Sequence, residues 1–185
     1  RWTLAYPGVP FPVIGKLIFP HTGGVVPPDT YAMLFTMHGT IMIFFAITPI
    51  LTGAFGNFCI PLMIGARDMI FPTLNMLSFW FSMASGVVLL ASLALPLGAA
   101  AGGWTSYPTL STNIGQPGLG QTLWLLSLFL FGISSTMGAI NYVTTVITLR
   151  APGMDYFKMP LTIWGLWLTA ILNAIFVPVL GAGMI

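Results

Sequence analysis

The side chains best able to do chemistry in this sequence are a few polar residues inside long apolar runs. His38 lies between Met37 and Gly39, with no acid or base near it in the sequence. Within a membrane, polar and ionisable groups are costly, so each is a candidate functional residue. A neutral imidazole is a common metal ligand, and haem iron accepts axial histidine. His38 is therefore a candidate ligand, and a hydrogen bond to a neighbouring helix explains it equally well.

A second group of polar residues forms a series that begins with an acid. Amide and hydroxyl groups both donate and accept hydrogen bonds, so they can order water without trapping a proton. The series therefore predicts a water-filled proton path from one side of a membrane to its centre. For any single member, hydrogen bonding that holds membrane helices together is the commoner explanation. In order of expected depth the members are Asp68, Asn75, Asn57, Asn141, Ser135 and Ser134.

Long apolar helices must position these residues. The chain has 185 residues, of which 57% are hydrophobic and 4% charged, whereas a soluble domain has about a quarter charged residues. A membrane-spanning helix needs about 20 mostly apolar residues. We predict an all-α, polytopic transmembrane helix bundle forming one membrane domain over residues 1–185, with an outer extramembrane connector at 1–30. The predicted spans cover about 31–64, 74–97, 122–149 and 161–184.

Composition also excludes several classes of function. So few charges argue against a soluble protein or a nucleic-acid partner and favour the lipid bilayer. The single cysteine excludes a disulfide framework and a cysteine-based metal site in this chain. Arg67, Arg150 and Lys158 fall in short loops on one side, which the positive-inside rule places in the cytoplasm. A start at arginine and an apolar end predict a piece of a longer chain.

Five strings of residues along the chain are distinctive. They are MHGTIMIFF at 37–45, PLMIGARDM at 61–69, GWTSYP at 103–108, GISSTMGAIN at 132–141 and RAPGM at 150–154. In residues and in order, these strings resemble subunit I of the A-type haem–copper oxidases, and the resemblance covers essentially the whole chain. It implies a fragment of a twelve-helix subunit, from the end of the family's helix I to within its helix V, with four of the transmembrane helices.

The resemblance implies a haem site. His38 matches an axial ligand of the low-spin haem iron, expected to be haem A and alternatively haem B. Arg1 matches an arginine that contacts the formyl group of this haem. The other low-spin haem ligand, the high-spin haem ligand and the copper ligands are expected downstream of this chain, since its only other histidine is His21. The fragment is therefore expected to contain no catalytic residue and to be inactive alone.

The resemblance also implies roles for the polar series. Asp68 matches the acid at the mouth of the family's D proton pathway, and Asn57 and Asn75 match the asparagines just above it. The residues that match the upper reach of this pathway are Asn141, Ser134 and Ser135.

The implied function is that of a proton-pumping terminal oxidase, which reduces O2 to water with electrons from cytochrome c. The expected partners are the rest of subunit I, subunits II and III, cytochrome c and the bilayer. A bacterial cytoplasmic membrane is the expected location, with the mitochondrial inner membrane as the alternative. A quinol oxidase of the same superfamily and, more remotely, a cofactor-free transporter remain open.

Overall fold

Helices account for all the regular secondary structure in the computed structural model, which describes residues 2–184 and contains no strand within that range. Within this described range, four helical stretches are long and apolar enough to cross a membrane, which confirms the predicted polytopic helix bundle. They are Pro28–Ile64, Pro72–Ser92, Gly120–Thr148 and Leu161–Ala182.

The described residues divide into two compact units, each considered by itself. The first unit contains the residues up to Thr40 together with Ser92–Gln121. Its helices are short apart from α3. They are α1 (Trp2–Ala5), α2 (Gly15–Ile18), η1 (Pro20–Thr22), α3 (Pro28–Thr40) and α6 (Pro108–Ser111).

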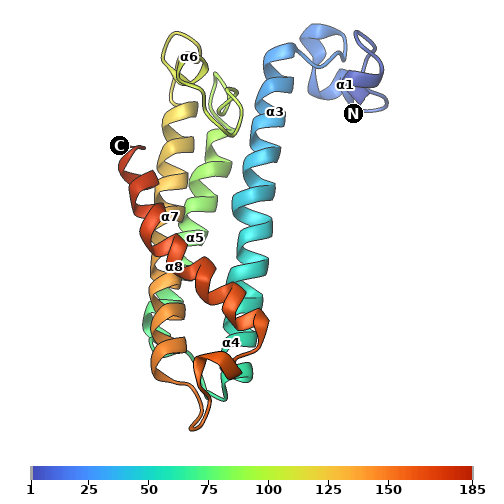
Figure 1. Cartoon of the computed structure of the whole chain (residues 1–185). Coiled ribbons are helices and arrows are strands. Elements are labelled where there is room, and N and C mark those ends of the chain that lie inside the picture. The colour runs from blue at the N-terminus through green and yellow to red at the C-terminus, as the bar shows by residue number, and fades with distance from the viewer. Residues whose placement is uncertain (1, 185) are drawn as a thin grey trace. The chain divides into compact units, whose positions relative to one another are not determined.

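The second unit contains Ile41–Ala91 and the residues from Thr122 onward, and it includes most of the long helices. Figure 1 shows α8 crossing α7 obliquely within this unit. The unit includes the body of α5 and of α7, whereas the last residue of α5 and the first two residues of α7 belong to the first unit. Its helices are η2 (Ile41–Ile47), η3 (Pro49–Gly56), α4 (Asn57–Ile64), α5 (Pro72–Ser92), α7 (Gly120–Thr148), η4 (Tyr156–Lys158) and α8 (Leu161–Ala182).

The first long stretch is not a uniform α-helix, because η2 and η3 are π-helical. Pro49 has no N–H to donate and its ring crowds the preceding turn, so an α-helical ladder cannot pass through it unchanged. The Thr48 hydroxyl donates to the carbonyl of Ile43, five residues earlier, at 2.8 Å. Wide π turns are rare and often lie at functional sites. Hydrophobicity alone predicts the span but not this change of helix type.

The second span ends sooner than the sequence suggests. It is predicted to reach about residue 97, whereas α5 ends at Ser92. Continuing the helix would require Pro96 to donate an N–H to the Ser92 carbonyl, which proline cannot do. The Leu95 N–H donates to that carbonyl at 3.3 Å instead, and Gly98 follows with a positive φ of 78°.

The predicted connector at 1–30 contains local helical turns. The Phe11 N–H donates to the Gly24 carbonyl at 2.8 Å, which closes the segment on itself. A Cβ built on Gly15 would lie 2.7 Å from the Gly24 carbonyl oxygen, so this approach requires glycine.

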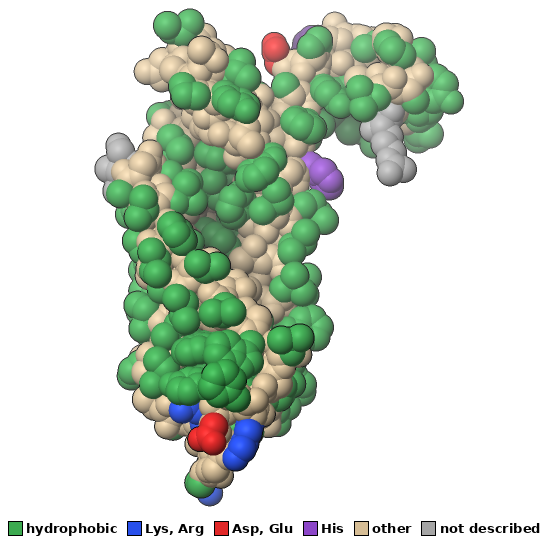
Figure 2. All heavy atoms as spheres, viewed as in Figure 1, with side chains coloured by type: hydrophobic (Ala, Val, Ile, Leu, Met, Phe, Trp, Pro, Cys, Tyr) green, Lys and Arg blue, Asp and Glu red, His purple; other side chains and the backbone are tan. Residues whose placement is uncertain are grey.

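The apolar core of the second unit joins α4, α7, α8 and the loops at one end of them. The Ala151 N–H donates to the carbonyl of Ile64 at 2.9 Å, so the loops after α4 and α7 meet. Figure 2 shows charged side chains of this unit gathered at one end, below a largely hydrophobic surface. The buried core residues are Ile60, Ile64, Met69, Ala139, Tyr142, Val146, Met159, Ile163 and Ala170.

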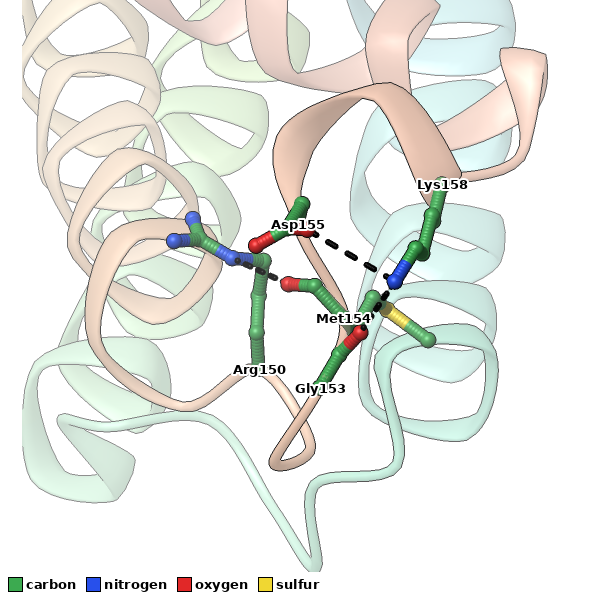
Figure 3. A network of polar contacts seen from close by, with 5 residues as sticks. All are labelled: Arg150, Gly153, Met154, Asp155 and Lys158. Atoms are coloured by element: carbon green, nitrogen blue, oxygen red, sulfur yellow. Dashed lines mark hydrogen bonds and ion pairs between the residues drawn. The ribbon is translucent and has the colours of Figure 1, made fainter.

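Arg150 organises the loop between α7 and α8, and Figure 3 shows its bond to Met154 in that loop. Its Nη1 donates to the Val146 carbonyl at 2.8 Å and its Nε to the Met154 carbonyl at 3.2 Å. Its guanidinium carbon also lies 3.7 Å from the centre of the Tyr156 ring. A cation at a helix C-terminus and over an aromatic face is favourable. The arginine therefore ends α7 and orients the chain into α8.

Candidate functional site

His38 lies on an open face of α3, in the first unit. Its side chain is exposed, whereas Thr36 and Met37 beside it are buried. The Thr36 hydroxyl donates to the Ala32 carbonyl at 2.8 Å and accepts the N–H of Gly103 at 2.9 Å. These bonds fix the face of α3 opposite the histidine.

The apolar side chains around His38 suit a flat, apolar ligand whose metal ion would bind the imidazole nitrogen. Leu34 and Phe35 are 49% and 61% exposed, and they lie one turn before His38 on the same side of α3. On the adjoining side, a Cβ built on Gly39 would lie 3.4 Å from Trp104 Cδ1, so the indole packs on the bare backbone there. Among residues 2–184, no group of three or more His, Cys, Asp or Glu side chains gathers to hold a metal ion. A haem needs only one ligand from this helix. Arg1, the other predicted haem residue, lies outside the described residues.

The second candidate site is a cavity of about 680 Å³ within the second unit. The predicted proton-path residues that line it are Asn57, Asp68, Asn75, Ser134 and Ser135. They come from α4, the loop after it, α5 and α7, so the fold brings together residues far apart in sequence.

Asp68 borders both this cavity and the exterior. Its side chain is exposed, and its Oδ1 accepts the N–H of Met69 at 2.7 Å. That bond uses one lone pair of a carboxylate and leaves the rest for water. An acid in this position can exchange protons with water outside and with water in the cavity.

Asn57 lies where the π-helical stretch passes into α4. Its Nδ2 donates to the Gly53 carbonyl at 2.6 Å, while its Oδ1 is buried without a hydrogen-bond partner. The Tyr142 hydroxyl donates to the neighbouring Thr52 carbonyl. Wide turns leave carbonyls in need of donors, and these two side chains supply them. A buried carbonyl oxygen without a partner is costly, so the free Oδ1 indicates water in the cavity.

The amides and hydroxyls further along the wall differ in how they are bonded. Ser134 donates to the Ser78 carbonyl at 2.6 Å, which ties α7 to α5. The structure gives the side chains of Asn75 and Ser135 no hydrogen bond to any of residues 2–184. Groups of this kind retain their full capacity to bind water.

Asn141 does not line the cavity. It is fully buried, its Oδ1 accepts the Phe71 N–H at 3.1 Å and its Nδ2 donates to the Phe71 carbonyl at 3.3 Å. Next to it, the Thr145 hydroxyl accepts the N–H of Ile70 at 3.1 Å. Asn141 therefore holds the loop that carries Asp68. This role matches the alternative that the sequence leaves open for each member of the polar series, namely hydrogen bonding that holds the bundle together.

Sequence reasoning missed several polar groups on the cavity wall. The structure adds side chains from η3, α5, α7 and α8, and the α8 face follows the helical spacing 166, 169, 170 and 173. That spacing is visible in the sequence, but nothing there shows that this face meets the cavity. The missed polar residues are Thr48, Thr52, Ser78, Ser82, Tyr142, Thr169 and Asn173.

Together these features define a membrane helix bundle with one histidine on an apolar helix face and a polar cavity that opens beside an acid. Residues 2–185 match the family described as cytochrome c and quinol oxidase polypeptide I. The chain belongs to this family, and the resemblance seen in the sequence is confirmed.

Curated relatives agree with the family match. The chain is 44% identical over 158 residues to "Cytochrome c oxidase subunit 1" of Thermostichus vulcanus, covering 85% of this chain and 28% of the relative. It is 41% identical over 172 residues to "Alternative cytochrome c oxidase subunit 1" of Bradyrhizobium diazoefficiens, covering 92% and 29%. For "Cytochrome c oxidase subunit 1" of Corynebacterium efficiens the identity is 44% over 152 residues, covering 82% and 26%. The chain thus spans little more than a quarter of these relatives.

Proposed function

We propose that this chain is part of the catalytic subunit of a proton-pumping terminal oxidase that reduces O2 to water with electrons from cytochrome c. Family membership supports an oxidoreductase, and the relatives' names specify cytochrome c oxidase. The same names favour cytochrome c over quinol as the donor, and they argue against a cofactor-free transporter. The remaining length of the subunit would supply the copper and high-spin haem ligands. Subunits II and III would complete the enzyme.

His38 is proposed to bind the low-spin haem iron, with haem A as the expected type. The exposed imidazole on an apolar face of α3 supports this role. When bound, the haem supplies one-electron transfer. The contribution of this chain is to hold the ligand in place. The hydrogen bonds of Thr36 fix the helix, and the Gly39 backbone lets Trp104 pack beside the histidine.

The polar cavity is proposed to conduct protons inward from the cytoplasm. The observation that carries this proposal is that an exposed acid and several amides and hydroxyls with unused hydrogen-bonding capacity line one cavity. Since a water molecule occupies about 30 Å³ in the liquid, the cavity has room for a continuous file of water. Asp68 would take up the proton from outside. Asn75, Asn57 and Ser135 would orient the waters that carry it onward.

Asn141 and Ser134 are proposed to support this path through hydrogen bonds that hold the elements around the cavity in place. Asn141 holds the backbone of Phe71, three residues after Asp68, so it fixes the acid relative to the cavity. Ser134 joins α7 to α5 through the Ser78 carbonyl. The bacterial relatives favour a bacterial cytoplasmic membrane as the location. The charged loops of the second unit would then face the cytoplasm.

The purified oxidase that contains this chain tests the proposal. We expect haem absorption bands, O2 consumption driven by reduced cytochrome c and acidification outside reconstituted vesicles. Consumption driven by quinol but not by cytochrome c would establish the alternative donor. A preparation without haem bands would contradict the oxidase proposal.

A further inference from the structure

One face of α8 forms a wall of the polar cavity, and it carries an asparagine to which the proton path gives no role. The residues that line the cavity from α8 are Leu166, Thr169, Ala170 and Asn173. Their spacing places them on a single helix face. The wall is therefore a continuous surface of α8.

Asn173 is the polar group on this wall whose side chain is free to bind water. The Thr169 hydroxyl donates to the carbonyl of Gly165 at 2.8 Å, so its proton is used within α8. Asn173 makes no hydrogen bond to any of the residues that the structure describes, and its side chain is partly buried at the cavity wall. An amide has two N–H donors and an acceptor oxygen. Leaving these groups unpaired within a membrane is costly, so water in the cavity is their natural partner.

The packing of α8 on α7 places Asn173 at the level of Ser135. A Cβ built on Gly132 would lie 3.4 Å from Val177 Cγ1, and one built on Gly181 would lie 3.7 Å from Phe129 Cδ2. The two helices therefore approach each other over this stretch and run in opposite chain directions. Asn173 lies about one turn before Val177, and Ser135 lies about one turn after Gly132. Both side chains line the same cavity, and neither has a protein partner among the described residues.

We propose that Asn173 is a positioning residue of the proton path. Its amide orders water opposite Ser135, so the polar wall of the path continues onto α8. This inference rests on the proposed proton path and extends it to a helix outside the predicted series. The competing role for Asn173 is packing between helices, in which its shape matters and its hydrogen bonds to water do not.

Asn173→Leu in the assembled oxidase tests this role, because leucine is close in size and binds no water. We expect proton uptake from the cytoplasmic side to slow about fivefold, the effect of one lost hydrogen bond in an ordered file. The low-spin haem spectrum should not change. Asn173→Gln keeps the amide and should return the rate to within about twofold of wild type. Thr162→Val, which removes a hydroxyl from an exposed position of α8 outside the cavity, should leave the rate unchanged.

Parallel measurement of Asp68→Asn separates this inference from the path itself. A wild-type rate in Asn173→Leu together with slow uptake in Asp68→Asn would overturn the role of Asn173 and leave the path intact. Wild-type rates in both would overturn both. A slow Asn173→Leu that Asn173→Gln does not improve would show packing and would also overturn the role. If Asn173→Leu does not assemble, proton uptake is measured in Asn173→Val instead, and the same outcomes support or overturn the role.

Discussion

The two candidate sites differ in the number of polar groups on which each one depends. On α3 a single imidazole stands on an apolar face, and the neighbouring side chains support it by packing and backbone hydrogen bonds. In the cavity of the second unit the polar groups are many, and several are free to bind water. At a metal site no neighbouring group can replace the single ligand atom. In a chain of ordered waters, many side chains share the task of positioning the water. Single substitutions should therefore act all-or-none at α3 and in graded steps at the cavity.

His38→Ala should have the largest effect. The proposed haem site takes its one ligand on α3 from the His38 imidazole, and no other histidine lies on α3 to replace it. We expect complete loss of the low-spin haem absorption band in the assembled oxidase. His21→Ala is the matched control, because His21 is exposed in the short η1 helix, and its spectrum should equal that of wild type. A normal band in His38→Ala would remove the contrast between the two sites.

Asn141→Leu should lower stability more than Asn75→Leu. Asn141 binds both the N–H and the carbonyl of Phe71 within a buried setting, and leucine would leave both groups unpaired. We expect a loss of about 2 to 6 kcal/mol, because two groups are left unpaired and each costs roughly 1 to 3 kcal/mol. The thermal unfolding midpoint of the complex measures this loss.

Asn75→Leu is the comparison variant for Asn141, since its side chain lines the cavity without a hydrogen bond to the described residues. It should slow proton uptake and leave the unfolding midpoint near wild type. Equal midpoints for the two variants would contradict the distinction between a residue that holds the loop and one that binds water.

Gly56→Ala should destabilise the π-helical part of the cavity wall. A Cβ built on Gly56 would lie 2.5 Å from Tyr142 Cε2, so the tyrosine that donates to Thr52 must move. Overpacking of this kind costs about 1 to 3 kcal/mol. Gly53→Ala is the matched control, because its Cβ would meet nothing closer than Pro49 Cβ at 3.9 Å. Unfolding midpoints that do not differ between the two variants would show that the Tyr142 side chain can move aside without a loss of stability.

Ser135→Ala should have the smallest effect. One hydroxyl of several is removed, and water can fill the space of the lost oxygen. We expect turnover to fall by about twofold, which is the lower end of the roughly 0.5 to 1.5 kcal/mol that one neutral hydrogen bond contributes, because water replaces the lost oxygen. Steady-state O2 consumption measures it. Complete loss of turnover would show that the cavity depends on a single group, as the site on α3 does. That result would contradict the contrast between the two sites.

Hydrophobicity and rare polar residues predict much of this molecule. Long apolar runs locate the four spans, because the thickness of the bilayer sets the number of apolar residues that a spanning helix needs. His38 and Asp68 stand out because polar groups are scarce in such a sequence. Asn57, Asn75, Ser134 and Ser135, which the sequence also singles out, line the cavity beside Asp68.

Contacts between helices account for what the sequence does not predict. The role of Asn141 depends on Phe71 lying opposite it, and sequence spacing says nothing about that pairing. The sequence does not predict the place of Asn173 on the cavity wall for the same reason, because α8 meets the cavity only through its packing on other helices. The π turns near Pro49 need Tyr142 from a distant helix to satisfy the Thr52 carbonyl. Apolar faces that meet lipid and apolar faces that meet helices look alike in sequence.

Proton uptake in Asp68→Asn tests the central claim most directly. The rate is measured with a pH-indicator dye on the cytoplasmic side while O2 oxidises the fully reduced enzyme. Asp155→Asn is the control, because Asp155 is an exposed acid whose pair with Lys158, at 3.6 Å, lies outside the cavity. We predict uptake at least about tenfold slower in Asp68→Asn, with an unchanged low-spin haem band and a normal rate in Asp155→Asn. A wild-type rate in Asp68→Asn would contradict the proposal that protons enter through this cavity.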